Sequence, residues 1–209
     1  MKKVLFLFFI TILASSCMNN NEDYGDKAYK NKDYTKALVL AGKGCKDKNG
    51  EACYMVANIY YMGLSHQIDH VQAARYYIKS CDIGNGRACY MLGKIYSDNV
   101  SIPQDIYQSG AYYRKSNKIL IKECNSGNAE SCLYAGALYL YGYGVAHDTN
   151  KAVSYFDKSC KLQFGAGCYS LGFLYSKGYD TIKEDKDLSN NFMNLACKYG
   201  YNNACSQQE

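Results

Sequence analysis

Cysteine is the residue type in this chain whose number and spacing could do chemistry. Ten of the eleven cysteines form five pairs, and seven residues separate the two partners of each pair. Thiols at a fixed spacing either bind a metal ion or form disulfides. Zinc sites usually show a C-x2-4-C spacing with further ligands nearby, and this chain lacks that pattern. Disulfides are therefore favoured, within the pairs Cys45 and Cys53, Cys81 and Cys89, Cys124 and Cys132, Cys160 and Cys168, and Cys197 and Cys205.

Such a pair cannot close within one continuous helix. Eight positions span about 12 Å along a helix axis, whereas the Cα atoms of a disulfide lie within roughly 7 Å of each other. The intervening segments, such as DIGNGRA and KYGYNNA, are rich in glycine and asparagine, which end helices and form turns. Each disulfide is therefore expected to join the end of one helix to the start of the next across a tight turn.

Two further groups of residues resemble parts of catalytic or metal sites. Ser97-Asp98-Asn99 matches one element of the serine β-lactamases, but the chain has no S-x-x-K and no K-T-G. Its place at the end of a predicted helix favours a helix stop. His66 and His70 are four residues apart, but they fall in a predicted loop without an evident third ligand. We therefore expect no catalytic residue, no metal site and no cofactor.

The first 17 residues are typical of a bacterial secretory signal. Two lysines precede an apolar run over residues 4–13, and small residues then lead to Cys17. The apolar run is too short to span a bilayer. Small residues directly before a cysteine resemble a lipobox, in which that cysteine is acylated. Because Ala14 stands where a lipobox usually has leucine, ordinary cleavage near Cys17 is the alternative.

Export and acylation together account for the cysteine content. An odd cysteine in an exported protein needs an explanation, and a lipid on Cys17 supplies one. Disulfides persist in the periplasm and outside the cell, so we expect a periplasmic or outer-membrane lipoprotein, or alternatively a secreted protein. Removal of the two leader lysines lowers the net charge from +5 to +3. A charge of this size does not indicate a nucleic-acid partner.

The cysteine pairs mark units that each contain two helices. Helix A follows the second cysteine, with a small residue four positions later and a tyrosine seven positions later in four units, which is helical periodicity. The tyrosines are Tyr60, Tyr96, Tyr139 and Tyr175. Helix B ends at the next unit's first cysteine. It carries an aromatic or leucine residue five positions before that cysteine in the regular units.

One unit is longer than the others. The first cysteines of successive units are 36 or 37 residues apart, but Cys81 and Cys124 are 43 apart. The surplus of seven residues is about two helical turns, so helix B of this unit is expected to lengthen while keeping its face. Pro103 stands just before this helix, where proline is tolerated.

Tyrosine is the second prominent residue type, with 23 copies. The recurring Tyr60, Tyr96, Tyr139 and Tyr175 are expected to pack between units, with their hydroxyls at the edge. The additional tyrosines could instead form a binding surface for a peptide or glycan on the concave face of the repeat. These candidates are Tyr61, Tyr112, Tyr113, Tyr141 and Tyr143.

The repeated segments resemble a known family. Helix A follows the pattern A-C-Y-x-L-G-x-L-Y-x-x-G, and helix B follows K-A-x-x-Y-x-x-K-S-C, as in KAVSYFDKSC. This is similar to the Sel-one-like repeat, a relative of the tetratricopeptide repeat, and to its exported Helicobacter-type cysteine-rich branch. The resemblance implies an all-α, right-handed α-solenoid of antiparallel helix pairs with one disulfide per repeat. It also implies roles in protein or cell-surface interaction, and slow hydrolysis of penicillins in some members.

These observations predict the organisation of the whole chain. Residues 1–17 form the signal segment with its lipobox-like end, 18–22 a short linker, 23–205 the solenoid of about five helix pairs, and 206–209 a C-terminal tail. We expect a monomeric, exported scaffold for a protein or peptide ligand or a cell-wall component. A weak β-lactamase or penicillin-binding protein is the alternative, suggested by the resemblance alone.

Overall fold

The computed structural model describes residues 23–98 and 103–207. The predicted signal segment with Cys17 and the linker lie outside these residues. The described part contains ten α-helices and a C-terminal 3-10 helix. They are α1 (Asp26–Lys30), α2 (Tyr34–Lys46), α3 (Gly50–Met62), α4 (His70–Ile83), α5 (Gly86–Ser97), α6 (Ile106–Asn125), α7 (Ala129–Tyr141), α8 (Thr149–Lys161), α9 (Gly165–Lys177), α10 (Lys186–Lys198) and η1 (Asn202–Gln207).

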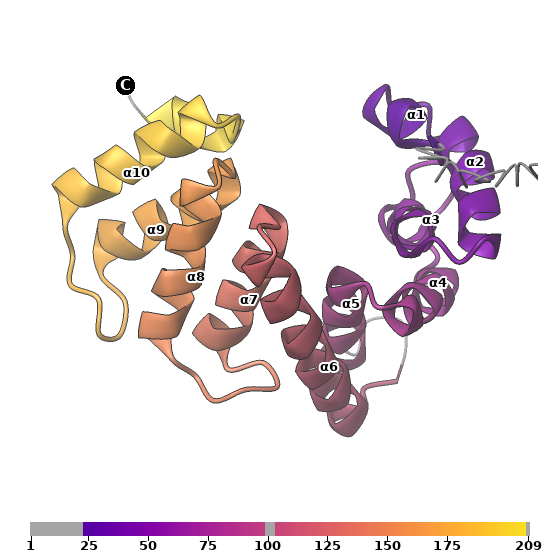
Figure 1. The fold of residues 1–209 in the computed structure, drawn as a ribbon, viewed down its shortest axis with the longest axis horizontal. Helices are drawn as coiled ribbons and strands as arrows, with labels where there is room; N and C mark the ends of the chain where they lie inside the picture. The colour runs from indigo at the N-terminus through magenta and orange to yellow at the C-terminus, as the bar shows by residue number, and fades with distance from the viewer. Residues whose placement is uncertain (1–22, 99–102, 208–209) are drawn as a thin grey trace, which may run out of the picture.

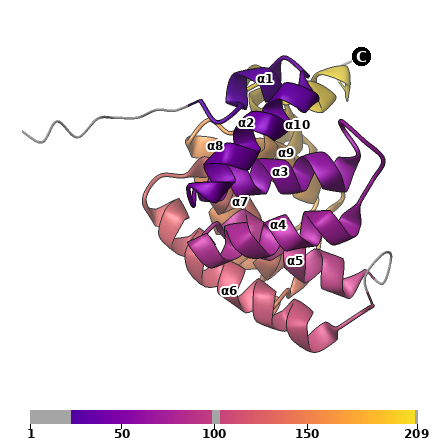
Figure 2. The ribbon, with the colours of Figure 1, turned by 90° about the vertical axis from the view of Figure 1, so that its right-hand side faces the viewer.

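The helices form successive antiparallel pairs that follow one another around an arc, with α1 and α10 at its two ends (Figure 1). Helices α3, α5, α7 and α9 are the A helices, and α4, α6, α8 and α10 are their B partners. The same helices appear as successive layers when the molecule is turned (Figure 2). Helices α1 and α2 form a short N-terminal pair, and η1 stands where a further A helix would begin. The predicted α-solenoid of antiparallel helix pairs is thus confirmed.

Side-chain caps set where the helices begin. Every B helix, and α2 before them, is preceded by an aspartate whose carboxylate accepts a hydrogen bond from a backbone N–H of the first turn. Helices α3, α5 and α7 use an asparagine in the same way. These are preferred capping residues, each worth about 1 kcal/mol. The negative charge of aspartate also suits the positive end of the helix dipole.

All five predicted disulfides are present. Their Cα atoms lie 4.5 to 5.0 Å apart across eight positions of sequence. Each bond joins the last turn of α2, α4, α6, α8 or α10 to the start of the element that follows. The chain therefore reverses within each pair, as the spacing requires.

A close approach between a small and a large residue holds helix A against helix B. The small residue stands four positions after the second cysteine, and the large one projects from helix B toward it. A methyl group in place of a glycine hydrogen here would come within 2.5 to 3.1 Å of the facing side chain. These glycine pairs are Gly93 with Tyr113, Gly136 with Phe156, and Gly172 with Met193. Ala57 and Tyr77 hold the matching positions in α3 and α4 and share one core cluster.

An aromatic stack lies beside each of these contacts. Ring centroids are 5.6 to 5.9 Å apart and the rings are nearly parallel, at 9 to 12°. The stacks are Tyr60 on Tyr76, Tyr96 on Tyr112, Tyr139 on Tyr155, and Tyr175 on Phe192. The recurring tyrosines are therefore packing residues, as predicted. They join the two helices of one unit, however, whereas the sequence suggested contacts between units.

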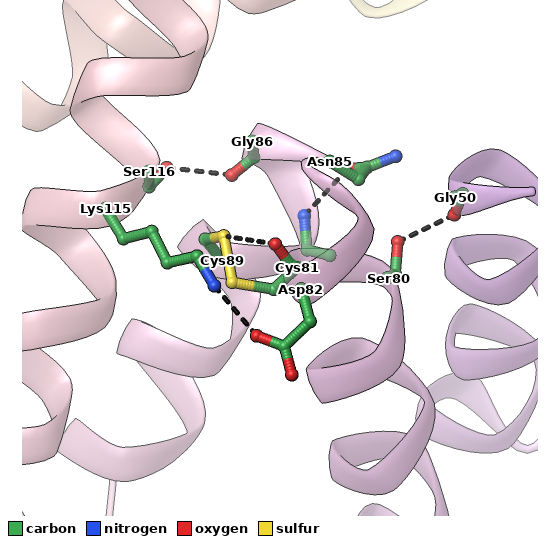
Figure 3. Close-up of a disulfide and its surroundings, with 10 residues drawn as sticks. Gly50, Ser80, Cys81, Asp82, Asn85, Gly86, Cys89, Lys115 and Ser116 are labelled. Atoms are coloured by element: carbon green, nitrogen blue, oxygen red, sulfur yellow. Dashed lines mark hydrogen bonds and ion pairs between the residues drawn. A yellow bond between two sulfur atoms is a disulfide. The ribbon is translucent and has the colours of Figure 1, made fainter. Parts of the chain in front are cut away.

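At the opposite end of three of the four pairs, a serine of helix B donates a hydrogen bond to a backbone carbonyl at the start of helix A. The distances are 2.7 Å from Ser80 to Gly50, 2.8 Å from Ser116 to Gly86, and 2.8 Å from Ser159 to Ala129. Figure 3 shows the first two of these bonds on either side of the Cys81–Cys89 disulfide. Because the carbonyl belongs to the first turn of an A helix, the bond fixes how far helix B slides along its partner.

The predicted extension of one B helix is confirmed, since α6 has 20 residues and the other B helices have 13 or 14. Within α6, Tyr112 and Ser116 make the contacts that Tyr76 and Ser80 make in α4. The seven extra residues therefore follow Ser116. They bury Leu120 fully, and they leave the Oδ1 atom of Asn117 buried without a hydrogen-bond partner.

We predict that Gly136→Ala destabilises the protein by about 1–3 kcal/mol. The new methyl group would lie 2.5 Å from the Phe156 ring and 3.1 Å from the Ala152 carbonyl, and overpacking of this kind is costly. Gly42→Ala is the matched control, because no heavy atom lies within 4 Å of a methyl group there. Its higher helix propensity should stabilise α2 by about 0.5–1 kcal/mol. Urea unfolding gives the free energy of unfolding of both variants. Equal changes in this free energy would contradict the close approach at Gly136.

We also predict that the disulfides stabilise the fold locally. Replacement of Cys124 and Cys132 by serine should cost about 2–3 kcal/mol through loop entropy. The loss of hydrogen-exchange protection should centre on the end of α6 and the start of α7, because a repeat unit contacts mainly its neighbours. Replacement of Cys197 and Cys205 should release only η1 and the end of α10. Uniform loss of protection along the chain in either variant would instead indicate one indivisible core.

Candidate functional site

The A helices line the inner face of the arc. Successive A helices α5, α7 and α9 pack against one another more than successive B helices do. On this face, the residue directly after the second cysteine is aromatic in α3, α5 and α9 and leucine in α7. These residues are rotated about 100° from the buried cysteine before them, and each is only partly buried. They are Tyr54, Tyr90, Leu133 and Tyr169. The inner face is thus an apolar, largely aromatic surface.

A groove opens on this surface between α5, α7 and α9. Its volume is about 420 Å³. Tyr141 at the end of α7, Phe173 of α9 and Tyr179 after α9 are 57, 54 and 41% exposed and form its rim. None of the lining residues carries a formal charge. They are Tyr90, Leu133, Tyr134, Ala137, Leu140, Tyr141, Phe156, Tyr169, Ser170, Phe173, Leu174 and Tyr179.

Ring contacts hold the aromatic residues of the groove in place. Tyr90 of α5 meets Tyr134 of α7 edge to face, with centroids 5.0 Å apart, and meets Tyr113 of α6 at 5.6 Å. Tyr169 packs on Tyr201 at 4.6 Å. Aromatic pairs of this geometry contribute about 0.5–1.5 kcal/mol beyond the area they bury. The rings at the base of the groove are therefore preorganised.

Arg87 joins three successive A helices at one end of the inner face. Its guanidinium pairs with Glu51 of α3 and with Glu130 of α7, the latter at 2.5 Å. It also lies over the Tyr54 ring, 4.6 Å from the centroid. Burial alone would lower the pKa of Arg87, but the two carboxylates outweigh burial and raise it. This charged bridge links the first turns of α3, α5 and α7.

Tyrosine hydroxyls near the groove are kept protonated by their surroundings. Burial raises the pKa of Tyr90 and Tyr54 well above the ordinary value of 10.0, and the nearby Tyr134 raises that of Tyr54 further. Burial also raises the pKa of Tyr113 to about 12. Tyr77 is fully buried and donates a 2.6 Å hydrogen bond to Asn58. These hydroxyls are therefore neutral hydrogen-bonding groups at any physiological pH.

A sequence profile of the Sel1 repeat matches four segments of the chain, residues 50–85, 86–118, 129–164 and 165–201. The chain belongs to the Sel1 repeat family. The four segments coincide with the four A and B helix pairs, and the unmatched residues 119–128 contain most of the two extra turns of α6. The predicted family is thus confirmed, and the profile locates the interruption where the packing places it.

Solved structures of other Sel1 repeat proteins are similar to this chain, and the first two named here share its fold. The Sel1 repeat protein of Oxalobacter formigenes is 21% identical, with a TM-score of 0.61 over 87% of this chain and 71% of that one. The protective antigen c5321 of uropathogenic Escherichia coli is 23% identical, with a TM-score of 0.54 over 81% of this chain and 35% of that one. Helicobacter pylori cysteine-rich protein B is 25% identical, with a TM-score of 0.43 over 65% and 92%. No curated protein matches the chain.

The five tyrosines predicted as a binding surface of this Sel1 repeat protein have different environments. Tyr141 lines the groove, and the exposed Tyr143 packs beside it at 5.4 Å. Tyr61 is half-buried against His70, and Tyr112 is half-buried in its stack on Tyr96.

The prediction for Tyr113 was wrong, because this residue is only 4% exposed and fills the space above Gly93. The extra turns of α6 shift its distance from Cys124 by seven residues. That shift hid its equivalence to Tyr77, Phe156 and Met193, which fill the same position in the other pairs.

Sequence reasoning missed most of the groove. Tyr90 and Tyr169 share the position after the second cysteine, and this recurrence was the available signal. Tyr179 shares its repeat position with Tyr143, eleven residues after the second cysteine, which was a further signal. Phe173 recurs at no equivalent position, so its place on the rim could be learned only from the packing of α7 and α9.

The serine-aspartate element and the two histidines that the sequence singled out make local contacts rather than forming a catalytic or metal site in the described residues. The Ser97 hydroxyl donates to the Lys94 carbonyl at 2.7 Å, and Asp98 caps α5, as expected of a helix stop. Asn99 lies outside the described residues. His66 contacts Ser65 at 2.6 Å, and His70 stacks on Tyr61. In the part of the chain that the structure describes, no three potential ligands gather around a metal-sized space. Nor does that part contain a helix able to cross a membrane.

We predict that alkaline pH unfolds the protein by ionising its buried tyrosines. A phenol titrates near pH 10 in an unfolded chain and higher in the folded one, so the folded state holds more protons between these values. Its stability is therefore fully present below about pH 10 and is lost as pH rises through the folded pKa values. In an ultraviolet titration of the folded protein, the buried tyrosines should ionise only well above pH 10. After reduction and unfolding, all tyrosines should ionise in one step near pH 10. A single step near pH 10 with the helices intact would contradict the burial.

Proposed function

We propose that this Sel1 repeat protein is an exported scaffold that binds an uncharged, apolar segment of a partner polypeptide in the aromatic groove. Sel1 repeat proteins generally mediate protein–protein interactions, and the five disulfides indicate an extracytoplasmic protein. The observation that carries the proposal is the groove itself. Its walls are aromatic and aliphatic, and its exposed rim consists of Tyr141, Phe173 and Tyr179.

The chemistry of the lining favours a polypeptide over a cell-wall glycan. A glycan presents many hydroxyl groups, which need hydrogen-bond partners when they are buried. Apart from five tyrosine hydroxyls, the polar side chain of the lining is that of Ser170, which already donates its hydroxyl to the Ala166 carbonyl at 2.9 Å. Tyrosine and phenylalanine side chains, in contrast, contribute large contact areas at protein interfaces. Burial between α7 and α9 would therefore cost an apolar peptide side chain fewer hydrogen bonds to water than it would cost a glycan.

The groove can be tested with a random peptide library displayed on phage and panned against the disulfide-bonded protein. We expect enrichment of sequences with aromatic or aliphatic residues. Tyr141→Ala with Phe173→Ala should weaken binding of an enriched peptide at least tenfold, because hot-spot aromatics often contribute about 2 kcal/mol or more. Tyr107→Ala is the matched control, since Tyr107 is 84% exposed at the start of α6 and outside the groove.

Two outcomes would contradict a peptide-binding groove. One is an equal loss of affinity in the Tyr107 control, which would indicate a general aromatic surface. The other is failure of the library to enrich any sequence while soluble muropeptides bind with dependence on Tyr141 and Phe173, which would assign the groove to a cell-wall glycan.

We further propose that the mature protein is attached to the outer membrane through a lipid on Cys17, with a soluble periplasmic or secreted protein as the alternative. The support is the segment MKKVLFLFFITILASSC and the odd cysteine left by the five disulfides. Met18 follows Cys17, and the absence of aspartate there favours the outer membrane by resemblance to known lipoproteins. Metabolic labelling with palmitate should label the wild type but not Cys17→Ser. Lack of label in the wild type would indicate ordinary secretion.

A further inference from the structure

The extra turns of α6 create a step in the solenoid. Seven residues add about 10 Å to a helix, so the turn after α6 is displaced along the helix from the turn between α4 and α5. The side of α6 is exposed between these two turns and forms one wall of a notch of about 620 Å³. The notch is lined by Ile83, Gly84, Lys118, Ile119, Lys122, Glu123, Ser126 and Asn128. Figure 3 shows the adjoining residues, among which Lys115 reaches across to Asp82 beside the Cys81–Cys89 disulfide.

The floor of the notch is apolar. Ile83, the last residue of α4, is 42% exposed although it is an aliphatic residue. Ile119 is partly buried and approaches the backbone of Gly86. Removal of such exposed aliphatic surface from water is favourable, at about 25 cal/mol per Å². The floor can therefore take one apolar side chain of a partner.

The rim of the notch is cationic. Lys118 and Lys122 are both exposed and stand one turn apart on α6. The nearest carboxylates are engaged, since Glu123 accepts a 2.6 Å hydrogen bond from Ser131 and Asp82 pairs with Lys115. Among residues 23–98 and 103–207, neither Lys118 nor Lys122 has a carboxylate partner. Two lysines without an ion-pair partner and the carboxylate of Glu123 therefore give the lining of the notch a formal charge of +1.

Helix α6 is one of two described helices with a formal charge of +3, and the other is α2. Four basic residues, Arg114, Lys115, Lys118 and Lys122, and one acidic residue, Glu123, give this helix a formal charge of +3. The complete chain has a net charge of +5. A surface with this excess attracts an anionic partner and accelerates its association.

We propose that the notch beside the extra turns of α6 is a second docking site, and that it binds an acidic polypeptide segment carrying an apolar side chain. The carboxylates of the segment pair with Lys118 and Lys122, and the apolar side chain lies on Ile83 and Ile119. A flat anionic membrane fits less well, because it would engage the lysines but leave the recessed floor empty. The site lies on the interruption of the repeat, apart from the aromatic groove.

The test measures fluorescence anisotropy of three short synthetic peptides with the disulfide-bonded mature protein. One peptide consists of glutamate and leucine, the second has serine in place of leucine, and the third has lysine in place of glutamate. We expect the first peptide to bind best and the third not to bind. Lys118→Glu with Lys122→Glu should weaken the first peptide about tenfold or more, equivalent to roughly 1.4 kcal/mol. Ile83→Ser should weaken the first peptide but leave the second unchanged.

Lys43→Glu with Lys46→Glu is the matched control, because it makes the same charge change at the end of α2, beside a disulfide without extra turns. It should change the affinity less than threefold, as should Tyr141→Ala with Phe173→Ala in the aromatic groove. Circular dichroism of each variant checks that the helices are retained.

Three results would overturn the proposal. Equal weakening by the control reversal would show attraction to the whole basic surface. Equal affinity for the leucine and serine peptides would show that the apolar floor does not contribute to binding. Binding to phosphatidylglycerol vesicles with dependence on Lys118 and Lys122, without binding of the first peptide, would assign the lysines to a membrane surface.

Discussion

The close approach of helix A to helix B at a residue with a small side chain is the interaction on which the rest of this solenoid depends. Glycine or alanine four positions after the second cysteine lets the facing Tyr77, Tyr113, Phe156 or Met193 enter the space between the helices. The aromatic stack beside this contact, together with the serine hydrogen bond at the far end in three of the four pairs, then fixes the rotation and the sliding of helix B. Interiors packed this tightly tolerate few alternative arrangements.

The disulfides constrain a different part of the solenoid. They bridge the turn from one helix B to the next element, so they constrain the connection between units rather than the packing within a unit. A solenoid gains stability from each unit and from each contact between neighbouring units. Small units with little core of their own depend on such covalent links in an oxidising compartment. Within this stapled arrangement, α5, α7 and α9 contact one another and line the aromatic groove.

The periodic part of this architecture could be predicted from the sequence, because cysteine, small and aromatic residues recur at fixed positions. The pairing of the cysteines, the alternating helices and the extra length of α6 all follow from that spacing. The environment of Tyr113 could not be predicted from the sequence. The cysteine spacing gives the number of inserted residues but not their place within the helix. The aromatic groove was missed for another reason. Phe173 reaches its rim through the packing of α7 and α9, which no recurring position in the sequence indicates.

The interruption in α6 tests this account most directly. If local contacts within each pair fix the register, deletion of residues 117–123 removes two turns and leaves every A and B contact of the neighbouring units in place. Peptide mapping without reduction, after the deleted chain has refolded from the reduced state, should find all five native disulfides, including Cys124–Cys132. Mispaired cysteines or free thiols at Cys124 and Cys132 would contradict the account, because the register would then depend on the inserted turns themselves.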